Sequence, residues 1–168
     1  MSGLRLVLLR EPAFAFLFWI VQTVLDLIIG IGIIKIAIEF IDKKVPEYKD
    51  LFYYQPIVNY FIVALLTGLI VVVGLILLII PGIYFGLRLK FAVYLVIDKN
   101  LGPVEAIKKS WKMTKGNVWN LFFFGFLLGL INILGFLCLI IGLFITVPLS
   151  MLATAFVYRK LLLQSKAA

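Results

Sequence analysis

Long apolar runs separated by short polar segments dominate the pattern of this chain. Five runs have the length of a membrane crossing, at about 13–40, 56–80, 82–98, 118–141 and 143–163. A helix of about 20 apolar residues crosses the hydrocarbon layer of a bilayer. The pattern therefore predicts an all-α integral membrane protein with about five transmembrane helices, arranged as a single membrane domain over residues 1–168.

Two of these runs are unusual. The first would extend roughly 40 Å as a helix, which is longer than the hydrocarbon layer is thick. It must therefore tilt, project from the bilayer, bend near residues 30–32, or fold back there as a re-entrant pair of half-helices. The third run contains Arg88 and Lys90. The N-terminal topology consequently stays open between one crossing and a re-entrant segment.

A short polar segment with four lysines and one glutamate lies at residues 102–117, GPVEAIKKSWKMTKGN. Gly102 and Pro103 favour a helix start there, and Gly116 favours a left-handed C-terminal end. At 100° per residue, one side of this helix carries Val104, Ile107, Trp111 and Thr114, and the other carries Glu105, Lys108, Lys112 and Lys115.

This segregation predicts a basic, interfacial amphipathic helix over about 103–115. Its apolar side would lie beneath the headgroups, with the indole of Trp111 among its groups. The basic side chains expected to bind anionic lipid are Lys108, Lys109, Lys112 and Lys115. The alternative is that the helix packs on the protein's own spans or on a partner and its lysines are merely solvated.

An internal repeat becomes visible when the second apolar run is laid on the fourth with an offset of 61 residues. Gly68 and Gly74 then match Gly129 and Gly135. Each copy ends in a break that is followed by another apolar run. The pattern predicts a repeated helical hairpin at about 56–98 and 118–163, with both copies running in the same direction across the membrane and related by an axis along its normal.

Small residues recur at helical spacing within these runs. Such residues let helix backbones approach closely in lipid. The predicted helix-packing positions are Ala64, Gly68, Gly74, Gly125, Gly129 and Gly135. We favour packing within the chain, and an interface between copies of the chain is the alternative.

Among the polar residues at membrane depth, the candidates for function are Asp26, Arg88, Lys90 and Asn132. Buried charges are costly in lipid unless they are paired, so an ion pair of Asp26 with Arg88 or Lys90 is expected. Snorkelling of the two cations to the interface is one alternative. A proton or substrate pathway is the other.

A net charge of +8 raises the question of nucleic acid, but the basic residues flank apolar runs instead of forming an exposed basic domain. Anionic lipid is therefore the expected counter-charge, and no nucleic-acid partner is expected. Five crossings would place most basic residues on one face. The positive-inside rule then predicts a multi-pass protein of a prokaryotic cell (inner) membrane, with the basic helix and the C-terminus in the cytoplasm.

Enzyme chemistry finds little support. The chain has no histidine and a single cysteine, Cys138, and it shows no carboxylate pair or nucleophile–base set. We therefore expect no catalytic residue, metal or cofactor. Two function classes stay open: a non-enzymatic membrane module that packs with membrane partners or anionic lipid, and a transporter or permease component.

Residues 78–122 carry a resemblance to a known family. They contain a Pro81–Gly82 break, a helix that ends in Asp98, the basic helix with Ser110, and a span that opens near Phe122. This pattern resembles a prokaryotic group of multi-pass membrane proteins of unknown function, similar to the membrane domain of glycerophosphoryl diester phosphodiesterases. The resemblance implies an all-helical domain that commonly has six spans, here with a shortened N-terminus. It does not bring the phosphodiesterase activity, because the catalytic barrel with its acidic metal ligands is not in this chain.

Overall fold

The computed structural model of the chain describes residues 2–44, 56–137 and 142–167. Every regular element within these ranges is a helix, which confirms the predicted all-α class. In chain order the helices are α1 (Ser2–Ile41), α2 (Ile57–Leu77), α3 (Ile79–Leu89), α4 (Ala92–Lys99), α5 (Pro103–Met113), α6 (Val118–Leu137) and α7 (Leu143–Ala167).

Four segments of the described chain are long and apolar enough to cross a membrane: Ile57–Leu77, Ile79–Lys99, Val118–Leu137 and Leu143–Ser165. They correspond to the last four predicted spans. Large apolar side chains on them face outward, and Ile80 and Phe144 are each 81% exposed. An exposed apolar surface of this extent is stable only against lipid or protein, so the chain is a membrane protein.

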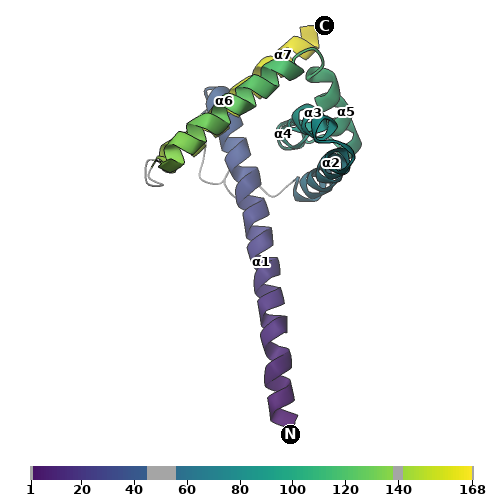
Figure 1. The fold of residues 1–168 in the computed structure, drawn as a ribbon, viewed down its shortest axis with the longest axis vertical. Coiled ribbons are helices and arrows are strands. Elements are labelled where there is room, and N and C mark those ends of the chain that lie inside the picture. Colours follow the sequence, from purple (N-terminus) through teal and green to yellow (C-terminus); the bar gives the residue numbers. More distant parts are fainter. Residues whose placement is uncertain (1, 45–55, 138–141, 168) are drawn as a thin grey trace.

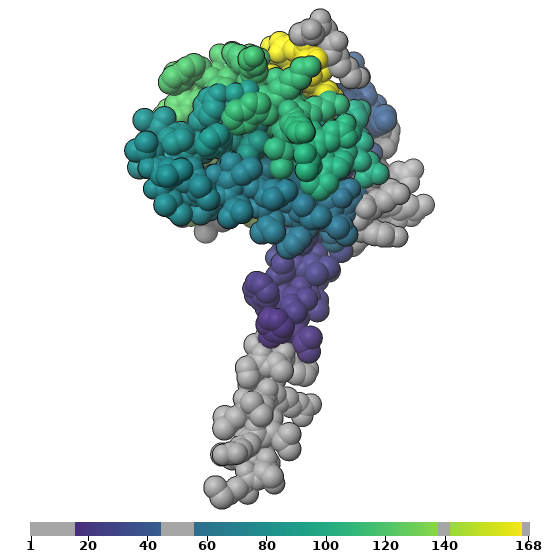
Figure 2. Space-filling view, turned by 90° about the vertical axis from the view of Figure 1, so that its right-hand side faces the viewer, coloured from purple at the N-terminus to yellow at the C-terminus, as the bar shows by residue number. Residues whose placement is uncertain are grey.

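The first predicted span lies within α1, a single helix of 40 residues. Figure 1 shows α1 as a long rod that leaves the other helices, and Figure 2 shows the same projection from the side. The helix continues without interruption through Gly30 and Gly32, so the re-entrant pair of half-helices is wrong. Only its C-terminal part enters the core, through residues such as Ile31 and Ile38.

The α2–α3 hairpin turns on one residue. Leu78 is extended, with φ −163° and ψ 144°, and it alone separates the two helices. The break therefore precedes Pro81, which lies in the first turn of α3. Proline is tolerated there because the backbone N–H groups of a first turn have no acceptor within the helix. The second hairpin joins α6 to α7 (Figure 1).

Glycine pairs bring the arms of each hairpin together. A Cβ atom at Gly82 would lie 2.7 Å from the backbone nitrogen of Leu75, and one at Gly74 would lie 2.9 Å from the Cα of Gly82. In the second hairpin, a Cβ at Gly142 would lie 2.4 Å from the carbonyl oxygen of Gly135. These distances are shorter than any real contact, so only glycine allows the two turns to close this tightly.

The other predicted packing glycines behave differently. A Cβ atom at Gly68, Gly125 or Gly129 would meet no atom within 4 Å. The packing within the chain that we favoured for these three glycines is therefore wrong for the described residues. An interface between copies stays a prediction for them, as does the rotation axis that would relate the two hairpins.

The hydrophobic core forms where the C-terminal part of α1 meets α2, α4, α5 and α7. Phe91, Leu95 and Tyr158 are fully buried at its centre. Ala106 of α5 is also fully buried, so the basic helix is part of the core. This core sets the position of the two polar sites described below.

Candidate functional site

The basic helix is α5, and its ends follow the predicted pattern. Gly102 is extended at the N-cap, Pro103 opens the helix, and Gly116 has a φ of +83°. Asn100 adopts a left-handed conformation at the end of α4, which turns the chain into α5. The helix itself ends at Met113, two residues before the predicted end.

α5 packs on the protein through a face that is offset from its predicted apolar side and shares Thr114 with it. Its buried residues are Ala106, Ser110 and Met113, followed by Thr114. The helix contacts α2, α3, α4 and α7. Val104, on the predicted apolar side, is 60% exposed and does not pack on the core, so its place beneath the headgroups stays a prediction. The helical wheel missed this face because it counts serine as polar, whereas small residues permit close helix contact.

A buried arginine fastens α5 to α3. Arg88 is 5% exposed, and its Nη1 donates to Tyr84 Oη at 2.6 Å. Its Nη2 donates to the backbone oxygen of Trp111 at 2.6 Å, and its Cζ lies 3.8 Å from the centre of the Trp111 ring. A planar guanidinium can lie flat on a ring while its in-plane N–H groups donate in fixed directions, a geometry that a lysine ammonium does not have.

Ser110 completes the contact from the other side. Its Oγ donates to the backbone oxygen of Arg88 at 2.7 Å. That oxygen lies in the last turn of α3, where helix carbonyls have no partner within the helix. We call Tyr84, Arg88, Ser110 and Trp111 the Arg88 clamp. The clamp gives the Arg88 guanidinium and the Arg88 backbone oxygen hydrogen-bond partners without any carboxylate.

The predicted pairing of Asp26 with Arg88 or Lys90 is wrong. Asp26 lies on α1 and accepts a 3.4 Å hydrogen bond from Gln22. Lys90 is exposed, and its Nζ lies 5.9 Å from the centre of the Phe124 ring. The expectation failed because it assumed that a buried cation needs an acid, whereas the ring and carbonyl oxygen of Trp111 and the hydroxyl of Tyr84 surround Arg88.

Asn132, the fourth predicted polar residue, connects α6 to α7. Its Nδ2 donates to Ser150 Oγ and to the backbone oxygen of Leu128, both at 3.0 Å. Ser150 Oγ in turn donates to the backbone oxygen of Thr146. These contacts tie the hairpin together at membrane depth, and they bring Asn132 near none of the charged residues predicted with it.

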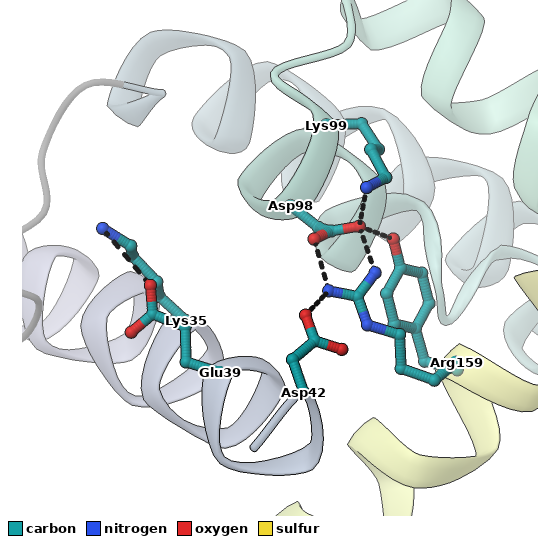
Figure 3. Close-up of polar contacts among 7 residues, drawn as sticks. Lys35, Glu39, Asp42, Asp98, Lys99 and Arg159 are labelled. Atoms are coloured by element: carbon teal, nitrogen blue, oxygen red, sulfur yellow. Dashed lines mark hydrogen bonds and ion pairs between the residues drawn. The ribbon is translucent and has the colours of Figure 1, made fainter. Parts of the chain in front are cut away.

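A second polar site, the Arg159 cluster, joins three helices (Figure 3). Arg159 of α7 donates from both terminal nitrogens to Asp98 of α4, at 2.8 Å each, and from Nη2 to Asp42, which follows α1. Tyr158 Oη donates to Asp98 at 2.8 Å. Lys99 Nζ lies 3.2 Å from the same carboxylate.

This cluster places the C-terminal ends of α1 and α4 beside α7. The Asp98 side chain is 8% exposed and that of Arg159 is 16% exposed, so the fork-to-carboxylate contact is largely shielded from water. Sequence reasoning did not predict the cluster. The available signal was that Asp42 and Asp98 each end an apolar run, on the membrane face where most basic residues were predicted to lie.

The described residues contain no group of three or more potential metal ligands. The two acids that do approach each other, Asp42 and Asp98, are bridged by Arg159. The cluster is therefore a structural contact between helices, with its charges matched internally.

We expect Arg88→Lys to loosen α5. Lysine keeps the charge but cannot make two hydrogen bonds while it stacks on Trp111. Hydrogen exchange of the backbone amides of 103–113 should accelerate by about tenfold, since one lost buried hydrogen bond to a charge is worth at least about 1.5 kcal/mol. Lys90→Gln is the matched control and should leave this exchange unchanged. Equal exchange in Arg88→Lys and the native chain would show that the clamp does not hold α5.

An all-helical fold with four potential spans and polar contacts between helix ends defines an integral membrane domain. Residues 57–166 match the family described as the membrane domain of glycerophosphoryl diester phosphodiesterase, and the chain belongs to this family. The match confirms the resemblance seen in residues 78–122.

Curated relatives are uncharacterized proteins of Mycobacterium bovis and of two strains of Mycobacterium tuberculosis. Each is 32% identical to this chain over 102 residues, which are 58% of this chain and 31% of the relative. The chain thus matches about a third of the length of these relatives. No solved structure matches it.

Proposed function

We propose that this chain is a non-enzymatic membrane module that presents α5 to anionic lipid headgroups. The observation that carries the proposal is that the Arg88 clamp and the buried Ala106–Ser110–Met113 face fix one side of α5 on the core. The opposite side then leaves Lys108, Lys112 and Lys115 exposed.

Electrostatics supports anionic lipid as the partner. A lysine near an anionic leaflet contributes about 1 kcal/mol of attraction, and several on one rigid surface act together. Because α5 is already folded on the core, little ordering entropy opposes this binding. The lysines of α5 make no ion pair among the described residues, which leaves them available to phosphate groups.

The transporter alternative receives no specific support. Asp26 lies on the exposed part of α1, away from the buried Arg88, and Asn132 is engaged between α6 and α7. Among the described residues, these polar groups form separate contacts, which favours the packing module over the transporter.

Replacing Lys108, Lys112 and Lys115 by glutamine should weaken binding of anionic lipid by about 100-fold, from roughly 1 kcal/mol for each lysine. The full chain in neutral detergent is titrated with phosphatidylglycerol or phosphatidylcholine, and the rise in its melting temperature is measured. The arginine triple variant at the same positions is the matched control and should bind as the native chain does. Equal stabilisation by both lipids, insensitive to salt, would refute the proposal.

We further propose that α5 and the C-terminus lie on the cytoplasmic side of a prokaryotic cell membrane, since basic residues collect on the face of the protein that carries them. A chain with Cys138→Ser and Lys109→Cys should react with an impermeant thiol reagent only after the cells are opened. Ready labelling of position 109 in intact cells would place α5 on the outer face and reverse the orientation.

A further inference from the structure

An apolar groove of about 480 Å³ lies between α3 and α6. Ile83, Tyr84 and Leu87 line it from α3, and Val118, Trp119 and Phe122 line it from α6. The volume falls within the range of roughly 300–1,000 Å³ that small-molecule sites occupy. Both walls belong to segments that can cross a membrane, so the groove opens toward lipid.

One end of the groove lies next to α5. The Tyr84 ring on its wall meets the Trp111 ring edge-on at 6.0 Å, and Tyr84 Oη accepts the hydrogen bond from Arg88. On the other wall, Val118 follows Lys115 by three residues. Lys112 and Lys115 are both exposed. They belong to the chain segment that leads from Trp111, at this end of the groove, to Val118 on its other wall.

The indole of Trp119 stands at the rim of the groove and is 74% exposed. Tryptophan takes such a position where hydrocarbon meets headgroups. An apolar groove that ends at an indole and a lysine-bearing helix is complementary to one kind of molecule, an amphiphile with a hydrocarbon tail and an anionic head.

We propose that the α3–α6 groove holds one acyl chain of an anionic phospholipid whose phosphate lies against Lys112 and Lys115. This inference rests on the proposed function, because the lysines select the headgroup, and it adds a discrete site for the tail. A defined site differs from loose attraction to a charged surface because it saturates at one lipid for each chain.

Native mass spectrometry of the full chain in detergent tests the site. The chain should retain one phosphatidylglycerol and prefer it to phosphatidylcholine by about 30-fold, from two lysines near the phosphate. Ile83→Trp fills the groove and should weaken binding of both lipids by about tenfold. Ile76→Trp is the control, because Ile76 is 79% exposed on α2 and lies outside the groove.

A second measurement does not depend on how Ile83→Trp folds. The Trp19→Phe chain keeps Trp111 and Trp119, both near the groove. Titration in detergent with phosphatidylglycerol brominated along its acyl chains should quench their fluorescence and saturate at one equivalent. Quenching that rises without saturation would overturn the inference.

The outcomes for the groove and for the lysines can be told apart. In one outcome, Ile83→Trp binds lipid as Ile76→Trp does, while the triple glutamine variant of Lys108, Lys112 and Lys115 loses the preference for phosphatidylglycerol. The groove site is then refuted and the proposed function stands. If Ile83→Trp releases the lipid but the triple glutamine variant still prefers phosphatidylglycerol, the acyl-chain site is supported and the role of the lysines is refuted.

Discussion

Gly82→Ala and Gly142→Ala should each destabilise the fold by about 1–3 kcal/mol, the usual cost of overpacking a tight contact. A methyl group at Gly82 would lie 2.7 Å from a backbone nitrogen, and one at Gly142 would lie 2.4 Å from a backbone oxygen. Backbone atoms cannot turn aside as a flexible side chain can, so the arms of the hairpin must separate. Neither glycine has a positive φ, and the clash alone accounts for the effect.

Gly68→Ala and Gly129→Ala are the matched controls. Their added methyl groups meet nothing within 4 Å. Alanine is also the better helix former by roughly 0.5–1 kcal/mol, so these variants should be neutral or slightly more stable. Unfolding of the full chain in detergent, followed by circular dichroism against temperature, compares the four variants. If Gly82→Ala melts together with Gly68→Ala, the hairpin contact is looser than described.

Arg159→Leu should destabilise the chain by about 3–5 kcal/mol, because it leaves a buried carboxylate without its partner. Asp98 would keep only Lys99, whose side chain is 39% exposed, and the hydroxyl of Tyr158. The link from α7 to Asp42 after α1 would be lost as well. Unfolding in detergent measures the loss, and Lys160→Leu on the exposed side of α7 is the control.

A compensating variant separates lost charge pairing from lost packing. When Asp42→Asn and Asp98→Asn are added to Arg159→Leu, the two carboxylates that Arg159 had neutralised are removed as well. Most of the stability should then return. Arg159→Lys should fall between the native chain and Arg159→Leu, since it keeps the charge but loses the fork geometry. If the triple variant is as unstable as Arg159→Leu, packing of the guanidinium stem is the dominant contribution.

The helical class, the last four spans and the start of α5 could all be predicted from the sequence. Each of these depends on neighbours along the chain: apolar runs of sufficient length, and the Gly102, Pro103 and Gly116 signals around one basic helix. The family could be recognised for the same reason, because its pattern lies in the continuous segment 78–122.

The partners of individual polar residues could not be predicted in this way. Asp26 was expected to pair with Arg88 or Lys90, on the general rule that acids neutralise buried bases. Arg88 instead meets Trp111 and Tyr84. Arg159 pairs with Asp42 and Asp98, which come from distant segments. Likewise, Gly68 and Gly74 were both predicted to pack against another helix, but only Gly74 contacts another backbone.

The sequence by itself thus determined that this chain is helical, belongs in a membrane and carries a basic helix, because hydropathy and local helix signals act over a few turns. Only the tertiary structure decided which face of α5 is buried, which glycines are in contact and which charges meet. Those outcomes depend on how separate helices approach each other, and many pairings of similar apolar surfaces have the same local pattern.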